Sequence, residues 1–443
     1  MNGRVVVPYA SDFSGWIDPP ADVGEPLAGE QACEVAVVGG GYTGLSAALR
    51  LAERGIDVAV LEADFCGWGA SSRNSGQLTP TIAGDPQLLA TVYRRRARGL
   101  VGLADGAVHF TERLIERLGI DCEYEPVGNV SVSLSPGQLR RAEKIARLLA
   151  EAGGEVAFVD GREFGLPERF LGGIHERAGG VMNPGMFARG LREALVGTSA
   201  KIFERTPVVG IERDARGVVL ETQGGRLRAE RVVLATNAWT RDLPEAPRRI
   251  VSPLWVTLAE TEPIDPERID GCGWTSRAGL YTEHLILESY RLTKRNTIVY
   301  GSRNVQAPRG RVGTRRPDAE VVDDLTAAFY GRFPTLTDVK PQSAWGGWIA
   351  MTPSWLPVAG EAAPNVFYAV GYNGHGLAQA PYLGSLLADR VAGDDTHEHL
   401  AVVWRDRPRF APNPLFSGPG VKLGWRIDRL TDRVMARSAS RGG

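Results

Sequence analysis

Two glycine-rich segments carry the groups best suited to holding an anionic ligand. In the first, GGGYTG at residues 39–44, Gly39 permits a tight turn and Gly41 lets a phosphate approach the main chain. Gly44 lets a helix that starts here lie close to a sheet, and the free N–H groups of that helix favour a pyrophosphate. Glu62 stands where a carboxylate accepts hydrogen bonds from a ribose 2′-hydroxyl. These residue types predict a dinucleotide site.

The segments around this turn must form a strand, a helix and a second strand. Val35–Val38 and Val58–Leu61 are short apolar runs typical of buried strands. Between them Leu45 and Leu49 recur at helical spacing, and Gly55 ends the pattern. A GxGxxG match alone is weak. With both strands, the helix and the terminal acid, it forms the fingerprint of a dinucleotide-binding βαβ unit.

The segment after Glu62 is rich in small and hydroxyl-bearing residues. It reads CGWGASSRNSGQL from Cys66 to Leu78. Such a composition cannot build a core, but its N–H groups and hydroxyls can surround a planar ligand. The alternative is an ordinary surface loop.

The second glycine-rich segment repeats the pattern of the first. Asn365–Val370 is a predicted buried strand, GYNGHG follows at residues 371–376, and Leu377–Val391 is a predicted helix. The N-terminus of such a helix holds negative charge, such as that of a reduced flavin near N1 and the C2 carbonyl. His375 either donates to that ring or bonds local backbone.

Composition narrows the class of protein. The chain of 443 residues is long enough for two domains, and its net charge of −1 gives no sign of a nucleic-acid partner. The four cysteines are scattered, so neither a zinc site nor a disulfide framework is predicted, which fits a cytoplasmic protein. We expect no signal peptide and no membrane span.

Four separated stretches together resemble one family. Gly39–Gly44 with Glu62, then Gly67–Leu78, Ala235–Trp239 and Gly371–Gly376, are similar to the D-amino-acid oxidase/glycine oxidase/sarcosine oxidase family of FAD-dependent oxidoreductases. GWGASSRNSGQL, the early Trp16 and TNAWT look closest to its gamma-glutamylputrescine oxidase-like branch. The resemblance implies an α/β fold, in which a Rossmann-like FAD-binding domain of glutathione-reductase type is joined to a discontinuous α+β antiparallel-sheet substrate domain.

The resemblance also implies how the chain divides. We expect FAD-binding segments at 1–118, 179–245 and 342–403, and substrate-domain segments at 119–178 and 246–341. Residues 404–443 would be a C-terminal tail, either an amphipathic helix on a membrane surface or a packed or frayed terminal helix. Residues 1–33 are either a loose tail or a strap held by Trp16.

The family pattern assigns the cofactor contacts. The residues implied to bind FAD are Gly39, Gly41, Tyr42, Thr43, Gly44, Glu62, Ala63, Ala70, Ser71, Ser72, Arg73, Asn74, Gly76, Gln77, Leu78, Val208, Gly371, Asn373, Gly374, His375, Gly376 and Leu377. Some members attach FAD through a Cys before a Met-Thr-Pro stretch, where this chain has Gly346 and Gly347. Others use a His where Arg73 stands. We therefore predict non-covalent FAD and no metal.

The implied reaction is oxidation of the CH–NH bond of a small amine or amino acid by hydride transfer to flavin N5, giving an imine that hydrolyses. No catalytic residue is identified. Tyr290 and Arg291 are the predicted substrate contacts, Arg291 as a carboxylate clamp. Some oxidases of the family carry a Lys that activates oxygen, and its position falls near Val299 of this chain. The electron acceptor is therefore left open between oxygen and another oxidant. The alternatives are a CH–OH donor or a flavin-binding module without catalysis.

Overall fold

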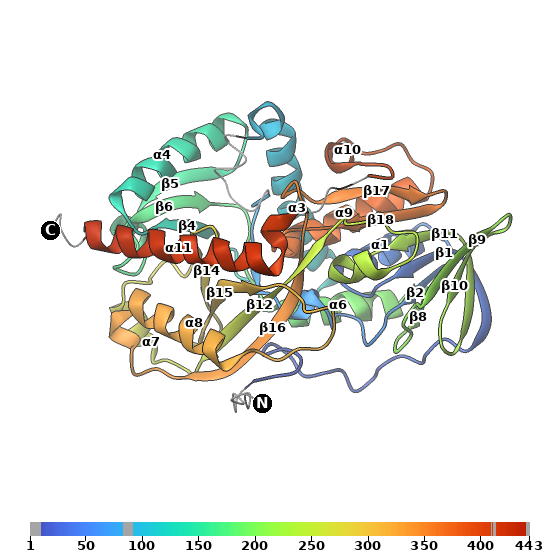
Figure 1. Cartoon of the computed structure of the whole chain (residues 1–443), viewed down its shortest axis with the longest axis horizontal. Coiled ribbons are helices and arrows are strands. Elements are labelled where there is room, and N and C mark those ends of the chain that lie inside the picture. Colours follow the sequence, from blue (N-terminus) through green and yellow to red (C-terminus); the bar gives the residue numbers. More distant parts are fainter. Residues whose placement is uncertain (1–9, 83–91, 409, 411–412, 440–443) are drawn as a thin grey trace.

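The described residues form two eight-stranded sheets (Figure 1). Along the sequence, groups of consecutive strands belong alternately to one sheet and to the other. The structure is a computed structural model that describes residues 10–82, 92–408, 410 and 413–439. Helical periodicity over residues 86–118 predicts a helix, which the structure shows as α3 (Ala97–Leu118), preceded by the 3-10 turn η2 (Arg94–Arg96). Residues 86–91 of that prediction lie outside the described residues.

The first sheet is mostly parallel and runs in the order β17-β18-β11-β1-β2-β8. Its strands are β1 (Gly29–Val38), β2 (Val58–Leu61), β8 (Lys201–Phe203), β11 (Gly225–Leu234), β17 (Val358–Ala363) and β18 (Val366–Val370), extended from β11 by β10 (Gly217–Glu221) and β9 (Gly210–Asp214). The predicted strands form because their apolar residues are buried on both faces, as parallel sheets require.

Two helices lie side by side on the first sheet, each following one of the glycine turns (Figure 1). They are α1 (Tyr42–Glu53) and α9 (Gly376–Val391). Their approach is close because Gly384 of α9 has no side chain: a Cβ there would lie 2.4 Å from the carbonyl oxygen of Thr43. This packing brings together two turns that are distant in sequence. On the other side of α1 lies α6 (Pro184–Val196), which Asn183 caps.

The second sheet is largely antiparallel, in the order β16-β12-β15-β14-β13-β4-β6-β5, with only β13 and β4 parallel among its described pairs. Its strands are β4 (Asn129–Ser133), β5 (Val156–Asp160), β6 (Gly172–Glu176), β12 (Ser252–Thr261), β13 (Gly279–Thr282), β14 (Glu288–Leu292), β15 (Ile298–Gln306) and β16 (Pro341–Met351). Helices α4 (Pro136–Glu151) and α8 (Ala319–Arg332) pack on it, while β3 (Gln77–Leu78) and β7 (Gly180–Val181) pair separately. The remaining short helices are α5 (Gly161–Phe164), α7 (Pro266–Gly271) and α10 (Glu398–Val403).

This architecture confirms the predicted α/β fold class. The division into two domains stays a proposal, which follows the two sheets. The expected FAD-binding segment 342–403 differs from the sheets at its start. Strand β16 pairs with β12 along its whole length, so the residues up to Met351 belong to the second sheet.

Residues 10–33 form a strap across the molecule rather than a loose tail, and residues 1–9 lie outside the described residues. Trp16 is buried, and its indole N–H donates to the carbonyl oxygen of Asn74 at 2.8 Å. Ser14 donates to the carbonyl oxygen of Ser72 at 2.5 Å, and the Leu27 N–H donates to Thr206 at 3.0 Å. The strap therefore holds the segment that follows Glu62.

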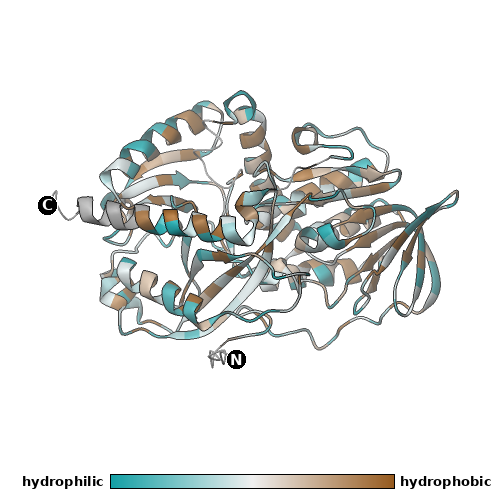
Figure 2. Ribbon diagram, in the orientation of Figure 1, coloured by the Kyte–Doolittle hydropathy of each residue, from teal (hydrophilic) through white to brown (hydrophobic). Residues whose placement is uncertain are grey.

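The C-terminal segment packs across the second sheet as α11 (Gly418–Ala439) (Figure 1). Asp428 is buried and accepts the N–H of Leu285 at 3.1 Å, while Arg429 pairs with Asp324 of α8. Apolar and polar residues alternate along α4, as expected for a helix with one packed face (Figure 2). Along α11 the apolar Leu423, Ile427 and Leu430 are exposed. Of the helices described here, none is both long and apolar enough to span a bilayer.

Candidate active site

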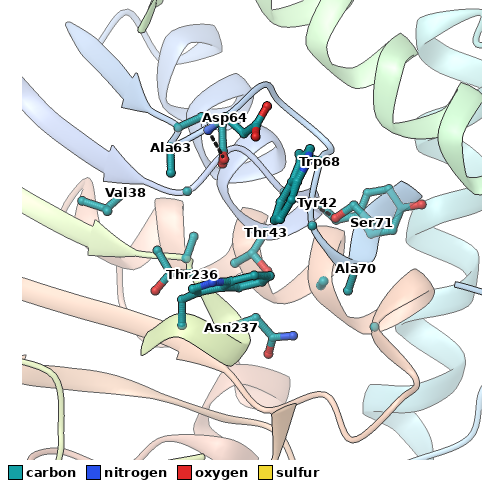
Figure 3. Close-up of a pocket in the computed structure, with 18 of the residues that line it drawn as sticks. Val38, Tyr42, Thr43, Ala63, Asp64, Trp68, Ala70, Ser71, Thr236 and Asn237 are labelled. Carbon is teal, nitrogen blue, oxygen red and sulfur yellow. Dashed lines mark hydrogen bonds between the residues drawn. The ribbon is translucent and has the colours of Figure 1, made fainter. Parts of the chain in front are cut away.

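A cavity of ≈ 460 Å³ lies at the carboxyl ends of β1, β2 and β11, where Val38, Leu61 and Ala235 line it. This is the edge where parallel α/β sheets bind ligands. Figure 3 shows Tyr42, Thr43, Trp68 and Asn237 around this space. We call it the first cavity.

The first glycine turn adopts the conformation that its sequence predicts. Gly39 has a φ of +106°, which favours glycine, and a Cβ on Gly44 would lie 1.8 Å from the carbonyl oxygen of Gly39. At Gly41 a Cβ would meet only the hydroxyl of Ser71, at 3.0 Å, so the main chain is open to a ligand. That hydroxyl also accepts the N–H of Tyr42 at 3.0 Å (Figure 3). Gly41 is the N-cap of α1 and supplies no side-chain cap.

Glu62 is fixed at the cavity wall by two main-chain donors. Its Oε2 accepts the N–H of Gly40 at 2.6 Å, and its Oε1 accepts the N–H of Asp64 at 3.0 Å. Burial raises the pKa of Glu62, and the two N–H groups oppose that shift. The carboxylate therefore stands ready to accept further hydrogen bonds from a diol.

The segment after Glu62 folds on itself into a compact wall. The amide nitrogen of Asn74 donates to the carbonyl oxygens of Ala70 and Ser71 at 3.1 and 2.9 Å, and its Oδ1 accepts the N–H of Gly76. Ala70–Ser72 form the 3-10 turn η1. The ordinary surface loop is thereby ruled out for residues 66–78, because Cys66, Ser72, Arg73 and Leu78 are buried.

Hydrogen bonds join the two glycine turns directly. Thr43 Oγ1 and Tyr372 Oη lie 2.6 Å apart, although 329 residues separate them. The N–H of Gly371 donates to Asn237 Oδ1 at 3.1 Å, which ties the Ala235–Trp239 stretch to the second turn. Asn373, at a φ of +54°, donates to the Gly371 carbonyl at 2.7 Å and accepts the N–H of Thr352 at 2.8 Å. Both turns thus face one cavity.

A second cavity of ≈ 260 Å³ opens beside the first. The residues common to both linings are Ala70, Asn74, Ile349, Asn373 and Gly374. His375 lines the second cavity, and burial lowers the pKa of its imidazole to about 4, so the ring is neutral at pH 7. The main-chain N–H of His375 donates to the Tyr372 carbonyl at 2.9 Å. The cavities therefore meet at the wall formed by Asn74 and the second turn.

The predicted cofactor residues fall into three groups. Those lining the first cavity are Gly39, Gly41, Tyr42, Thr43, Glu62, Ala63, Ala70, Ser71, Asn74, Val208, Asn373, Gly374, Gly376 and Leu377. Those lining only the second are Arg73, Gln77 and His375. Gly44, Ser72, Gly76, Leu78 and Gly371 line neither cavity, and shape the turns and the wall behind them.

The structure does not place Tyr290 or Arg291 at either cavity. Arg291 is 1% exposed, and its guanidinium donates to the carbonyl oxygens of Gly76 and Met182. Tyr290 is buried on the opposite face of β14, where it donates to Glu288 at 2.9 Å and packs on Phe333. The β14 side chain that does line the second cavity is Ser289. We therefore withdraw both residues as substrate contacts.

The contacts that sequence reasoning missed are tertiary ones. Tyr372, Asn237 and Gly384 lie in segments with a visible pattern, but their partners lie far along the chain. Leu415, Phe416 and Val421 of the C-terminal segment line the second cavity, and no local signature marks them.

Residues 34–390 match the family described as "FAD dependent oxidoreductase", DAO. The chain belongs to this family. The chain is 31% identical over 380 residues to gamma-glutamylputrescine oxidoreductase of Escherichia coli K12, and the aligned region covers 82% of this chain and 84% of that protein. It is 26% identical over 383 residues to glycine oxidase of Geobacillus kaustophilus, covering 83% of this chain and 95% of that one.

Two solved structures share the fold of this chain. The crystal structure of glycine oxidase from Geobacillus kaustophilus superposes with a TM-score of 0.73 at 23% identity, covering 86% of this chain and 100% of that one. L-Proline dehydrogenase from P. horikoshii gives 0.70 at 20% identity, covering 84% and 96%. At these identities the likeness establishes the fold alone. The family implies FAD as the cofactor.

The strap gives a first prediction for FAD binding. Replacing Trp16 by Ala removes the hydrogen bond to Asn74 and the ring on which the Arg291 guanidinium lies at 4.7 Å. We expect FAD affinity to fall about tenfold, because the wall at Asn74 loses its support. Trp16→Phe keeps a ring and should lose less. Titration of the apoprotein with FAD, followed by flavin fluorescence, measures both; equal affinity in all three proteins contradicts the prediction.

A buried carboxyl group behind the second cavity gives a prediction for pH. Glu176 is 3% exposed, and its Oε1 accepts from Thr81 at 2.7 Å and from Tyr281, which lines the cavity, at 2.9 Å. Burial raises the pKa of Glu176 to about 7 from 4.5, and Asp105 adds to the rise. The folded state therefore binds a proton that the unfolded state releases. This contribution is complete below pH 4.5 and is lost as pH rises through 7.

Glu176→Gln keeps the size of the side chain and removes this proton. As pH rises from 5 to 8, we expect the free energy of unfolding of the natural protein to fall, relative to that of the variant, by on the order of 2–3 kcal/mol. Only the natural protein loses the stability that the Glu176 proton contributes. Urea unfolding at both pH values measures the difference. Parallel pH curves for the two proteins would show that Glu176 titrates normally.

Proposed function

We propose that this protein is an FAD-dependent enzyme that oxidises the CH–NH bond of a small amine or amino acid to an imine, which water then hydrolyses. The observation that carries the proposal is the junction of the two cavities at Asn74, Asn373 and Gly374. A substrate in the second cavity would meet a ligand of the first at that junction. Two relatives, named gamma-glutamylputrescine oxidoreductase and glycine oxidase, support an amine or amino acid as the donor.

The first cavity fits non-covalent FAD. The open main chain at Gly41 and the first turn of α1 suit the pyrophosphate, and Glu62 suits the adenosine ribose. The start of α9 at Gly376 suits the negative charge of a reduced flavin. Gly346 and Gly347, which precede the Met-Thr-Pro stretch where some members of the family carry a Cys, have no group that could form a bond. When bound, FAD supplies the acceptor for the hydride of the substrate's α carbon.

The chain's own residues then serve mainly to position the substrate. The wall of Asn74 and Asn373 sets where the two cavities meet, and α11 with Phe416 covers the second cavity from the other side. Positioning and water exclusion are the main contributions expected when hydride leaves a neutral amine. A strong general base is not required if the amine binds deprotonated.

Anaerobic mixing with candidate donors tests the proposal. The purified protein should be yellow, and acid should release FAD from it, since no covalent bond is expected. Amines should bleach the visible flavin band without oxygen. Bleaching by hydroxy acids but not by amines would identify a CH–OH dehydrogenase, and bound FAD that no donor reduces would indicate a non-catalytic flavin module. Exposure of the reduced protein to air then shows whether oxygen is the acceptor.

A further inference from the structure

The lining of the second cavity is sorted by chemical type. Its side-chain amides and its imidazole come from the segment after Glu62 and from the second glycine turn, through Asn74, Gln77 and His375. The second sheet and the C-terminal segment contribute mainly aliphatic and aromatic groups, among them Leu254, Met351 and Phe416, together with the hydroxyls of Ser289 and Ser302. The polar end is the end shared with the first cavity. A substrate with its amine at the junction would therefore extend its other end among apolar side chains.

No carboxylate lines this cavity among the described residues. Glu288 directly precedes the lining residue Ser289 in the sequence. Its carboxylate accepts hydrogen bonds from Arg332, at 2.9 Å, and from Tyr290, away from the cavity lining. Glu283 accepts from Ser133 and pairs with Arg141 at 3.1 Å. A second ammonium group at the remote end of a substrate would find no partner of opposite charge.

Arg73 is the lining residue with a permanent charge among those described, and part of its guanidinium is engaged, whereas Nη2 is buried without a hydrogen-bond partner among the described residues. Its Nε donates to the Trp68 carbonyl at 2.8 Å and its Nη1 to those of Asp12 and Gly346, both at 3.1 Å. The guanidinium carbon lies 4.6 Å from the ring centre of Trp68. These three donor contacts hold Arg73 in the wall beside Asn74, and its charge disfavours a nearby ammonium.

From this distribution we infer that the enzyme's preferred substrates are monoamines whose remote end is apolar and uncharged, an alkyl or aryl chain. The inference rests on the proposed function, since it concerns the substrate of the same site. Its physical basis is desolvation: a charged remote end would leave water for a largely apolar space, in which no carboxylate among the described residues could pair with an ammonium. An alkyl chain gains from the same transfer.

Three amines of equal length test this preference in the holoenzyme. Hexylamine, 1,6-diaminohexane and 6-aminohexanoate share the reacting CH₂–NH₂ group and differ only in a terminal methyl, ammonium or carboxylate. We expect the second-order rate constant for anaerobic flavin bleaching to be at least tenfold larger for hexylamine than for either of the others. Equal or faster bleaching by the diamine or the amino acid overturns the inference and leaves amine oxidation intact. Absence of bleaching by all three, and by every other amine, instead removes the proposed function.

A pair of variants at Ser289 tests the cause. Ser289 is 4% exposed, and its hydroxyl has no hydrogen-bond partner within the described structure. Ser289→Asp places a carboxylate in the cavity wall, whereas Ser289→Asn adds nearly the same volume without charge. We expect the ratio of rate constants, diamine over hexylamine, to rise at least tenfold in the Asp variant relative to the Asn variant. Equal ratios overturn the inference, and should the Asp variant fail to bind FAD, the three-amine comparison in the natural protein decides.

Discussion

Gly44→Ala is expected to weaken FAD binding roughly a hundredfold. The added Cβ would lie 1.8 Å from the carbonyl oxygen of Gly39 and 3.2 Å from Val37 Cγ1, so α1 must move away from β1. The helix has no free direction to move, because Gly384 of α9 already touches the Thr43 carbonyl. Strain of about 3 kcal/mol concentrated at the pyrophosphate site corresponds to roughly a hundredfold loss of affinity.

Gly331→Ala is the matched control for this variant. Gly331 lies in α8, where a Cβ would meet nothing within 4 Å. Alanine is about 1 kcal/mol more favourable than glycine inside a helix, so this variant should be unchanged or slightly more stable. FAD content per chain after purification and the dissociation constant for added FAD compare the two. Full FAD content in Gly44→Ala would show that the first turn does not hold the cofactor.

Arg291→Met is expected to destabilise the fold by about 3 kcal/mol or more and to weaken FAD binding with it. The guanidinium is fully buried, which lowers its pKa to about 10, and it still carries charge at pH 7. Its guanidinium donates to the carbonyl oxygens of Gly76 and Met182. Gly76 lies in the wall formed by the segment after Glu62, and Met182 lies just before α6. Met fills similar space but removes the guanidinium donor of the Met182 carbonyl oxygen, while the Gly76 carbonyl oxygen keeps the main-chain N–H of Met182 at 2.8 Å, and Trp16 loses its cation.

The same variant separates a structural role from a substrate clamp. A clamp would raise KM for amino acids and leave the melting temperature and FAD content unchanged. Arg226→Met is the control, because Arg226 is exposed on the first sheet and pairs with Glu221 at 3.1 Å, a surface contact worth at most about 1 kcal/mol. A Tm of Arg291→Met equal to that of Arg226→Met would contradict the structural role.

The sequence alone predicted the parts of the molecule whose signals are local. Strand, glycine turn and helix follow one another within about thirty residues in a βαβ unit, and each has its own periodicity or steric requirement. For this reason the first turn, the second turn and the βαβ unit form where their residues indicated, with Gly39 at a φ of +106° and Glu62 at the end of β2. The segment from Cys66 to Leu78 could be assigned to the same site because it follows Glu62 directly.

The substrate side shows what local patterns leave open. Alternation along a strand puts Ser289 and Arg291 on one face of β14, but it does not say which element covers each of them. In the folded chain Ser289 meets the second cavity, whereas Arg291 meets Trp16 of the strap and the main chain of Gly76. Sequence alone cannot tell a charged side chain that binds a ligand from one, such as Arg291, that binds the chain's own main-chain oxygens, because its tertiary partners are not visible there.

Only the tertiary structure decided how distant segments close the site. The hydrogen bond between Thr43 and Tyr372, the contact of Gly384 with Thr43 and the C-terminal cover of the second cavity all join residues far apart in the chain. Local sequence determines the conformation of a turn because the backbone sterics act between neighbouring residues. It cannot determine which turns meet, because that depends on the packing of whole sheets and helices against one another.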